Sequence, residues 1–467
     1  MQRGRGKKPF MKLKTRQPIA VLLVSLLVVI GGAVKTATPI PTQELQDDLH
    51  TLMMMIERVH PEMYAYTAKD AFEKQIEEAN RRLDRPMTPV EFYRVVAPLV
   101  SALKSGHTYV ALPGWAEHLK ADGRFYPMDI CWDGEEVILA HYYGPPEPPS
   151  EPPPLGGTIV SINGRPAREL LLRLSRYFPA EGQEGNRFEL EWPALLQQAL
   201  WSEFQTADLR LRIRDLEGRS HDYLIKPITL KQAAKEKMPH HDEELFSCRY
   251  MPEYRAALLR IESFGSQHFS DFRRFLSRTF VDVRKREVTS LILDLRDNGG
   301  GASNGVRALL GYLTRRDILL QEGESSLARI LSSAQVLAPV PFEGRVFVLI
   351  GKRSASAAVG CAAAIQYYRL GTLVGEETTE QMQFFAESRR FTLPHSRLVY
   401  VVASDRTVVI GRKGQVGGLK PDYKVEQSRL DTAKGIDTVQ EFTLRLIQNE
   451  HRGTERNRSE PDPVSRK

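Results

Sequence analysis

A serine at the end of an apolar segment is the first candidate for chemistry in this sequence. Residues 346–364 read VFVLIGKRSASAAVGCAAA, which predicts a strand, a tight turn and an alanine-rich helix that opens at Ser356. At such a junction the N–H of Ala357 is free, and the helix dipole favours negative charge. A hydroxyl beside a donor for a developing oxyanion suits acyl transfer. The alternative is that Ser354 or Ser356 only caps the helix.

A glycine-rich turn follows another apolar segment. Residues 291–305 read LILDLRDNGGGASNG, with three consecutive glycines directly after the expected strand. Glycines let backbone N–H groups approach a ligand without obstruction, so Gly300 and Gly301 are candidate oxyanion donors; a turn that needs positive φ is the alternative. The dinucleotide fingerprint G-x-G-x-x-G fails, because its third glycine position is Asn304.

A histidine provides the candidate base. His107 lies in a Ser-Gly-His-Thr turn between an expected helix and an expected strand. A serine nucleophile at neutral pH needs a general base, and imidazole is the usual one. A lone histidine in a turn is more often structural, so the catalytic interpretation requires that His107 meets Ser356 in the fold.

Six motifs in a fixed order resemble those of the carboxy-terminal-processing (tail-specific) and tricorn-core serine peptidases. They are Gly106-His107-Thr108, Ile162-Asn163-Gly164, Asp294 to Gly301, Ser354 to Ala357, Gly375-Glu376 and Gly418 to Asp422. The resemblance implies an α/β (α+β overall) chain with a ClpP/crotonase-like catalytic core, an N-terminal helical cap and a PDZ-like region around Gly156–Leu172. It also implies a peptide or protein substrate and no metal or other cofactor.

The family has two catalytic forms, and the sequence favours one of them. In the serine–lysine form the lysine follows the serine by about 25 residues, but that position is Gln381. In the serine–histidine form a glutamate three residues before Gly-x-x-Pro-Asp orients the histidine; here that position is Gln415. A glutamine carbonyl can hold the ring but contributes little charge stabilisation. Glu377 and Glu387 are candidates for the missing charge. The aspartate that often precedes Gly-His-Thr is Ser105.

The order of the expected elements divides the chain into regions. Helical periodicity over 40–105 predicts a cap, and short strands over 106–235 predict a β-rich region that contains the PDZ-like segment 156–172. Residues 243–448 alternate apolar strands with helices, which predicts a largely parallel sheet with its ligand site beyond the carboxyl ends of the strands. Residues 450–467 are charged and are expected to be disordered.

The amino-terminal segment predicts export. Seven Lys and Arg residues among the first sixteen precede the uncharged run 19–34, so residues 1–35 are expected to be a secretory signal or a membrane anchor, with the body outside the cytoplasm. The net charge of +7 equals the charge of this basic cluster, which argues against a nucleic-acid partner.

Three scattered cysteines permit one disulfide at most and lack metal-ligand spacing. The sequence permits an oligomer.

Three functions compete at this point. The first is an exported serine endopeptidase in which Ser356 attacks, His107 moves the proton, Gln415 orients the ring and the N–H groups of Ala357 and Gly300 or Gly301 bind the oxyanion. The second is a non-catalytic relative that binds peptides by strand addition in the PDZ-like region. The third, a crotonase-like acyl-thioester enzyme, is disfavoured by export.

Overall fold

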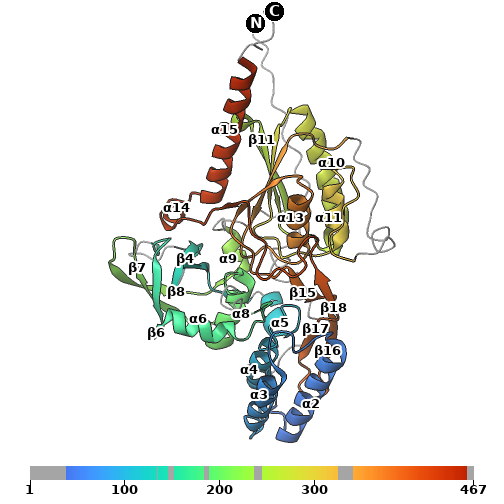
Figure 1. The fold of residues 1–467 in the computed structure, drawn as a ribbon. Coiled ribbons are helices and arrows are strands. Elements are labelled where there is room, and N and C mark those ends of the chain that lie inside the picture. Colours follow the sequence, from blue (N-terminus) through green and yellow to red (C-terminus); the bar gives the residue numbers. More distant parts are fainter. Residues whose placement is uncertain are drawn as a thin grey trace, which may run out of the picture.

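The computed structural model describes residues 38–121, 123–133, 135–145, 152–182, 189–235, 245–323 and 340–459. The predicted leader at 1–35 and most of the proline-rich segment lie outside these ranges. Within the described ranges, no helix has the length and apolar character needed to cross a membrane. Helices α2, α3 and α4 lie at one end of the molecule, and the large sheet lies toward the other (Figure 1).

The helical cap consists of α2 (Thr42–Val59), α3 (Lys69–Arg81) and α4 (Pro89–Ser101). Helix α2 buries apolar residues at helical spacing: Leu45, Leu49, Leu52 and Ile56. Helix α4 begins with a capping box between Thr88 and Glu91 and with Pro89 in the first turn, where its missing N–H costs nothing. Helices α2, α3 and α4 thus lie within the segment 40–105, for which the sequence predicts a helical cap.

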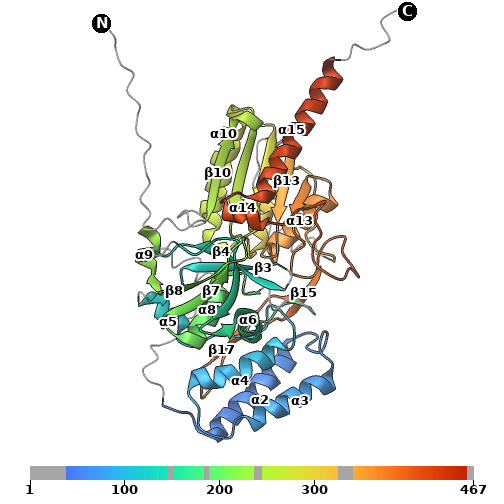
Figure 2. The same ribbon diagram turned by 90° about the vertical axis from the view of Figure 1, so that its left-hand side faces the viewer.

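The cap contains one element that the sequence did not predict. A three-stranded sheet of β1 (Tyr109–Val110), β17 (Val399–Val402) and β16 (Arg389–Thr392) packs on these helices. Tyr400 of β17, together with Leu393 and Leu398 from the turn between β16 and β17, shares one apolar cluster with α2 and α4. A hairpin from the predicted catalytic core thus completes the core of the cap (Figure 2).

The middle region is built on an antiparallel sheet with the strand order β3-β4-β5-β7-β8. The strands are β3 (Met128–Asp133), β4 (Glu136–Tyr142), β5 (Thr158–Ile162), β7 (Leu209–Arg214) and β8 (Ser220–Ile225), with the short β6 (Arg165–Pro166) beside β5. Helices α6 (Ala167–Ser175) and α8 (Pro193–Phe204) share one apolar cluster with this sheet. Strand β7 alternates buried and exposed residues along its length, as expected for a sheet with one solvated face. The small pair β2 (Arg124–Phe125) and β9 (Ile228–Thr229) and helices α5 (Trp115–Lys120) and α9 (Leu230–Lys235) flank the region.

The large sheet has the order β10-β11-β12-β13-β14-β19 and is parallel except for the first pair. Its strands are β10 (Phe246–Met251), β11 (Ala256–Ile261), β12 (Ser290–Asp294), β13 (Arg345–Ile350), β14 (Thr372–Gly375) and β19 (Tyr423–Lys424). All five residues of β12 are buried, which explains why three consecutive apolar residues, Leu291, Ile292 and Leu293, form its middle.

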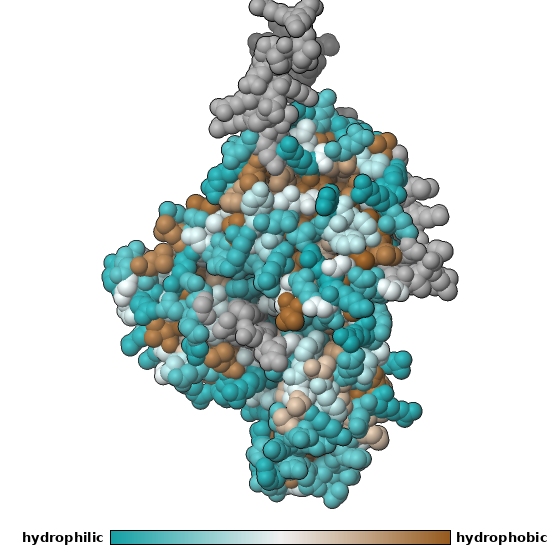
Figure 3. Space-filling view, in the orientation of Figure 1, coloured by the Kyte–Doolittle hydropathy of each residue, from teal (hydrophilic) through white to brown (hydrophobic). Residues whose placement is uncertain are grey.

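Helices cover both faces of this sheet. Leu291 and Leu293 share a cluster with α10 (Phe269–Lys285), α11 (Ser303–Leu310) and α13 (Ala357–Tyr367), whereas Ile292 belongs to a cluster with α15 (Thr438–Ser459). The alternation along β12 reflects the two-residue period of a strand. The helix-and-sheet architecture expected from the sequence is confirmed. The face of the molecule drawn in Figure 3 is largely hydrophilic, and its apolar residues are scattered.

The remaining elements are short. They are the pair β15 (Gln383–Ala386) and β18 (Asp405–Val408), the 3-10 turns η1 (Pro252–Tyr254) and η2 (Ser266–His268), and α14 (Arg429–Ala433). Cys131, Cys248 and Cys361 are free thiols.

The expected disorder from residue 450 needs a correction. Helix α15 continues to Ser459, and residues 460–467 lie outside the described ranges. The helix is anchored by Val439, Leu444 and Ile447 on the sheet. Beyond this anchor no proline interrupts the chain before Pro461, so the backbone hydrogen-bond pattern can propagate.

Candidate active site

Ser356 lies in a strained turn between β13 and α13. Its backbone has φ 52° and ψ −121°, a region that non-glycine residues rarely occupy. The surrounding contacts hold this turn: the Gly351 N–H donates to Ser354 Oγ at 3.1 Å, and Ser354 Oγ donates to the Leu295 carbonyl at 2.8 Å. Ser354 is therefore a structural residue of the turn, and no side-chain cap hydrogen bond is formed by Ser356.

The glycine turn after β12 packs directly against Ser356. A Cβ at Gly300, where φ is 98°, would lie 2.6 Å from the Ser356 Cβ. A Cβ at Gly301, where φ is 133°, would lie 2.3 Å from the Phe264 carbonyl carbon. The buried Asn298 joins the two turns, because its carbonyl accepts from the Ala355 N–H at 3.0 Å and its side chain donates to the Ile261 carbonyl at 2.9 Å. Gly300 and Gly301 are therefore needed for the close approach of this turn to Ser356 and to the backbone of Phe264.

The three proposed oxyanion donors differ in their availability. The Gly300 N–H donates to Asn298 Oδ1 at 2.8 Å, so it is already occupied. For the N–H groups of Ala357 and Gly301, the described part of the chain provides no hydrogen-bond acceptor. The geometry therefore leaves Ala357, at the start of α13, and Gly301 as the available donors.

His107 is held in the turn between α4 and β1. Its ring stacks on Phe384 of β15, with centroids 5.8 Å apart and an interplanar angle of 18°. Its Nδ1 is buried and has no hydrogen-bond partner among the described residues. Burial lowers the pKa of His107 to about 4, an effect partly opposed by the backbone of Phe385. At neutral pH the ring is therefore uncharged, as a general base must be.

A second histidine supports this turn from the cap. His60 Nδ1 accepts from the Glu62 N–H at 3.2 Å, which leaves Nε2 to donate to Ser105 Oγ at 3.1 Å. Ser105 in turn donates to Thr108 Oγ1 at 3.3 Å, and Thr108 Oγ1 accepts from the Ala403 N–H at 3.0 Å. Ser105 thus holds the turn through neutral hydrogen bonds.

Glu181 fixes the same turn from the other side. Its carboxylate accepts from the Gly106 N–H at 2.7 Å and from the Phe385 N–H at 3.2 Å. It therefore ties the residue before His107 to strand β15, on which the imidazole stacks. Burial raises the pKa of Glu181 to about 8, and the negative charge of Glu380 adds to the effect.

Glu380 lies between the histidine and the serine. It belongs to the loop between β14 and β15 and is buried. One carboxylate oxygen accepts a hydrogen bond from the backbone N–H of Ser356, and the other lies 4.0 Å from His107 Nδ1. Burial raises the pKa of Glu380 to about 7, although the hydrogen bond from Ser356 opposes this shift. Glu380 and Glu181 lie outside the motifs that could be singled out from the sequence.

The structure places Gln415 outside the cavity that is lined by Ser356 and His107. Its side-chain amide donates to the Gly418 carbonyl at 3.0 Å, and its carbonyl oxygen accepts from Arg412 at 3.3 Å. Glu377 accepts from the Gly418 N–H at 2.9 Å, and Gln381 accepts from the Gly417 N–H at 2.9 Å. These side chains fasten the 415–419 loop, and none of them lines the cavity that contains Ser356.

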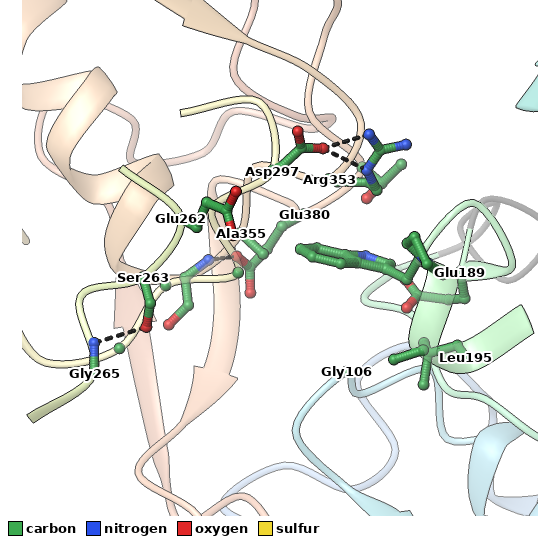
Figure 4. Close-up of a pocket in the computed structure, with 18 of the residues that line it drawn as sticks. Gly106, Glu189, Leu195, Glu262, Ser263, Gly265, Asp297, Arg353, Ala355 and Glu380 are labelled. Carbon is green, nitrogen blue, oxygen red and sulfur yellow. Dashed lines mark hydrogen bonds and ion pairs between the residues drawn. The ribbon is translucent and has the colours of Figure 1, made fainter. Parts of the chain in front are cut away.

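Ser356, His107 and Glu380 line one cavity with a volume of about 750 Å³. Its wall also includes Glu181, Glu189 and both Gly300 and Gly301, and it receives residues from the cap, the middle region and the large sheet. Figure 4 shows Glu380 and Ala355 on the side formed by the large sheet and Glu189 and Leu195 on the opposite side. Among the described residues, no group of three or more His, Cys, Asp or Glu has the geometry of a metal site.

A strained serine at a strand-to-helix turn, free backbone donors and a neutral, partly exposed imidazole line one cavity, an arrangement that suits the chemistry of a serine hydrolase. Sequence comparison specifies this class further. Residues 255–425 match the sequence model of peptidase family S41, and the chain therefore carries a domain of this serine peptidase family.

Curated relatives agree with this assignment over parts of their length. The chain is 34% identical over 122 residues to the tail-specific protease of Haemophilus influenzae, which covers 26% of this chain and 17% of that protein. It is 24% identical over 221 residues to the carboxy-terminal-processing protease of Bartonella bacilliformis, which covers 46% of this chain and 48% of that protein. The chain thus spans less than half of the length of each.

Solved structures share the fold over most of the chain. Mature CPAF superposes with a TM-score of 0.59 at 13% identity, covering 87% of this chain and 98% of that one. The complex of mature CPAF with lactacystin gives a TM-score of 0.57 at 14% identity, covering 87% and 100%. At these identities the similarity concerns the fold.

Proposed function

We propose that this protein is a serine endopeptidase that acts outside the cytoplasm, with Ser356 as the nucleophile and His107 as the general base. The observation that carries the proposal is the convergence on Glu380: one carboxylate oxygen meets the Ser356 backbone and the other approaches the His107 ring. The proposal is also supported by the cavity itself, because Ser356 and His107 both line it although they are 249 positions apart in the chain (356 minus 107).

The proposed reaction follows the general logic of serine hydrolysis. His107 removes the proton of the Ser356 hydroxyl as its oxygen attacks the peptide carbonyl, and the N–H groups of Ala357 and Gly301 donate to the resulting oxyanion. The imidazolium then protonates the leaving amine, and an acyl-enzyme remains on Ser356. Water, deprotonated by the same ring, releases the carboxyl product and restores the serine.

The names of the relatives support the proposed substrate class, and the leader supports the proposed location. Relatives named tail-specific and carboxy-terminal-processing proteases support a peptide or protein substrate. The basic and apolar segment at 1–35 supports export or anchoring at the membrane. An oligomer is compatible with this proposal, and no nucleic acid is needed for it.

The proposal is tested by cleavage of an unfolded protein. Wild-type protein and the Ser356→Ala and His107→Ala variants are incubated with reduced, denatured casein, and new peptide termini are identified by mass spectrometry. Wild-type protein should generate internal cleavages, and both variants should lose them. Ser303→Ala, at an exposed serine that starts α11, is the matched control and should cleave normally. Equal cleavage by Ser356→Ala would contradict the assignment, and a wild-type protein without cleavage would support the non-catalytic peptide binder instead.

A further inference from the structure

A buried nitrogen without a partner stands at the centre of the site. His107 Nδ1 is shielded from solvent, and no described residue forms a hydrogen bond with it. The closest carboxylate oxygen recorded for it is Glu380 Oε1 at 4.0 Å, just beyond hydrogen-bond distance. When the ring accepts a proton from the serine, a positive charge develops in a buried place, which is costly unless an anion is adjacent.

The position of Glu380 is fixed by the nucleophile turn itself. Its second oxygen accepts from the Ser356 N–H, and the neighbouring Thr379 Oγ1 donates to the Lys352 carbonyl at 2.8 Å. The loop that carries Glu380 is therefore anchored at both ends of the turn 352–356. Its carboxylate remains in contact with the residue that reacts, and its free oxygen faces the ring.

Two other side chains that could have oriented the His107 ring, those of Glu181 and Gln415, form hydrogen bonds with other groups. The two carboxylate oxygens of Glu181 accept from the N–H groups of Gly106 and Phe385. The amide of Gln415 is bonded to Gly418 and Arg412. Among the carboxylates of the cavity, Glu380 is thus the one whose oxygen approaches Nδ1.

We infer that Glu380 is the positioning residue for His107, taking the role expected for the side chain at position 415. Its carboxylate accepts the Nδ1–H of the ring, so Nε2 is left to take the Ser356 proton. The proton stays on the imidazole: Ser356 loses it, His107 becomes a cation beside the Glu380 anion, and the leaving amine receives it. This inference rests on the proposed function, since it assigns a partner to the same base.

The ionisation of Glu380 should control the pH dependence of the reaction. The positioning role requires ionised Glu380, and its pKa is raised to about 7 by burial. The charged or titratable groups that face it are His107, Glu181 and Glu189; the Glu380 charge helps to raise the pKa of each of the two carboxyls to about 8, after burial as the main cause. Reactivity should therefore rise with pH through about 7, well above the pKa of about 4 for His107.

The test measures the rate at which a fluorophosphonate modifies Ser356 between pH 4.5 and 9 in full-length protein. Wild-type protein should show an inflection near pH 7. Glu380→Gln keeps the shape and the hydrogen bond from Ser356 but cannot ionise, so its rate should fall about a hundred- to ten-thousand-fold and lose this inflection. Gln415→Glu, the matched variant at the family position, should keep the wild-type rate and profile. An unchanged profile in Glu380→Gln, or a gain above tenfold in Gln415→Glu, would overturn the inference.

A second measurement separates this inference from the proposed function. In the Ser356→Ala protein, the ¹³C shift of the His107 ring is followed by NMR as pH is raised. The shift should report the ionisation of Glu380 near pH 7, and Glu380→Gln should abolish that step. A ring that senses no such step would contradict the pairing even if wild-type protein is labelled. If no labelling occurs but the step is present, the pairing stands and the peptidase proposal fails.

Discussion

Glu380 Oε1 lies 4.0 Å from His107 Nδ1. The carboxylate comes from a loop at the edge of the large sheet, and the imidazole comes from the turn that leaves the helical cap. Under the proposed function, the turn that follows the cap supplies the base for the serine turn of the sheet, because His107 lies between α4 and β1. This explains why the hairpin β16–β17, which belongs to the catalytic region by sequence, packs into the core of the cap.

The close approach of the glycine turn to the serine predicts a sharp effect of one methyl group. Gly300→Ala places a Cβ 2.6 Å from the Ser356 Cβ at a φ of 98°, so the turns must separate. We expect loss of labelling at Ser356 and a decrease of about 1–3 kcal/mol in the free energy of unfolding. Urea titration and fluorophosphonate labelling measure the two effects.

Gly360→Ala is the matched control for that substitution. Gly360 lies inside α13, and a Cβ there would have no neighbour within 4 Å. Alanine in a helix interior should raise the free energy of unfolding by about 0.5–1 kcal/mol and leave labelling unchanged. A Gly300→Ala protein that is as stable and reactive as Gly360→Ala would contradict the described packing.

Glu181 provides a prediction about the position of the base. Glu181→Gln retains one acceptor oxygen, but the amide NH₂ cannot accept from the second of the two backbone donors at Gly106 and Phe385. Leaving a buried N–H unpaired costs about 1–3 kcal/mol. We expect reduced stability and at least a tenfold lower labelling rate, since the His107 turn loosens. A variant that is destabilised but labelled at the wild-type rate would show that Glu181 has a structural role alone.

Glu380 should make the stability of the protein depend on pH. Its folded pKa of about 7 is above the reference value of 4.5, so the folded chain retains a proton that the unfolded chain releases. The stability that protonated Glu380 contributes is complete below pH 4.5 and is lost as pH rises through about 7. Glutamine does not titrate. The free energy of unfolding of Glu380→Gln, relative to that of wild type, should therefore increase by on the order of 3 kcal/mol between pH 4.5 and pH 8.

Thermal or urea unfolding at both pH values checks this difference, with the exposed Glu343→Gln as a control for the loss of one charge. Parallel pH dependences for wild type and Glu380→Gln would contradict the buried position of this carboxyl. If both predictions for Glu380 hold, the ionised form that promotes the reaction is also the less stable one. Such a conflict is common where a site is built for function.

The sequence was sufficient for elements with a strong local pattern. The apolar segments 291–295 and 346–350 predicted β12 and β13, and the turns after them were correctly expected at one edge of the sheet. Ser356 could be singled out because a strand, a turn and an alanine-rich helix follow one another without interruption.

Contacts between distant loops were not predictable in the same way. Glu380 and Glu181 lie in segments without regular periodicity, and their neighbours are set by how the loops pack. The expectation for Gln415 came from the position of a family motif, yet local hydrogen bonds with Gly418 and Arg412 decide where this amide points. The hairpin β16–β17 belongs by sequence to one region and by packing to another, which no local pattern reveals.

The most direct test of the account is to map the adduct formed by a fluorophosphonate at pH 8 with mass spectrometry. We predict one modified residue, Ser356, and no adduct in His107→Ala, because the hydroxyl needs the imidazole from the cap. An adduct on another serine, or full modification of Ser356 without His107, would contradict it.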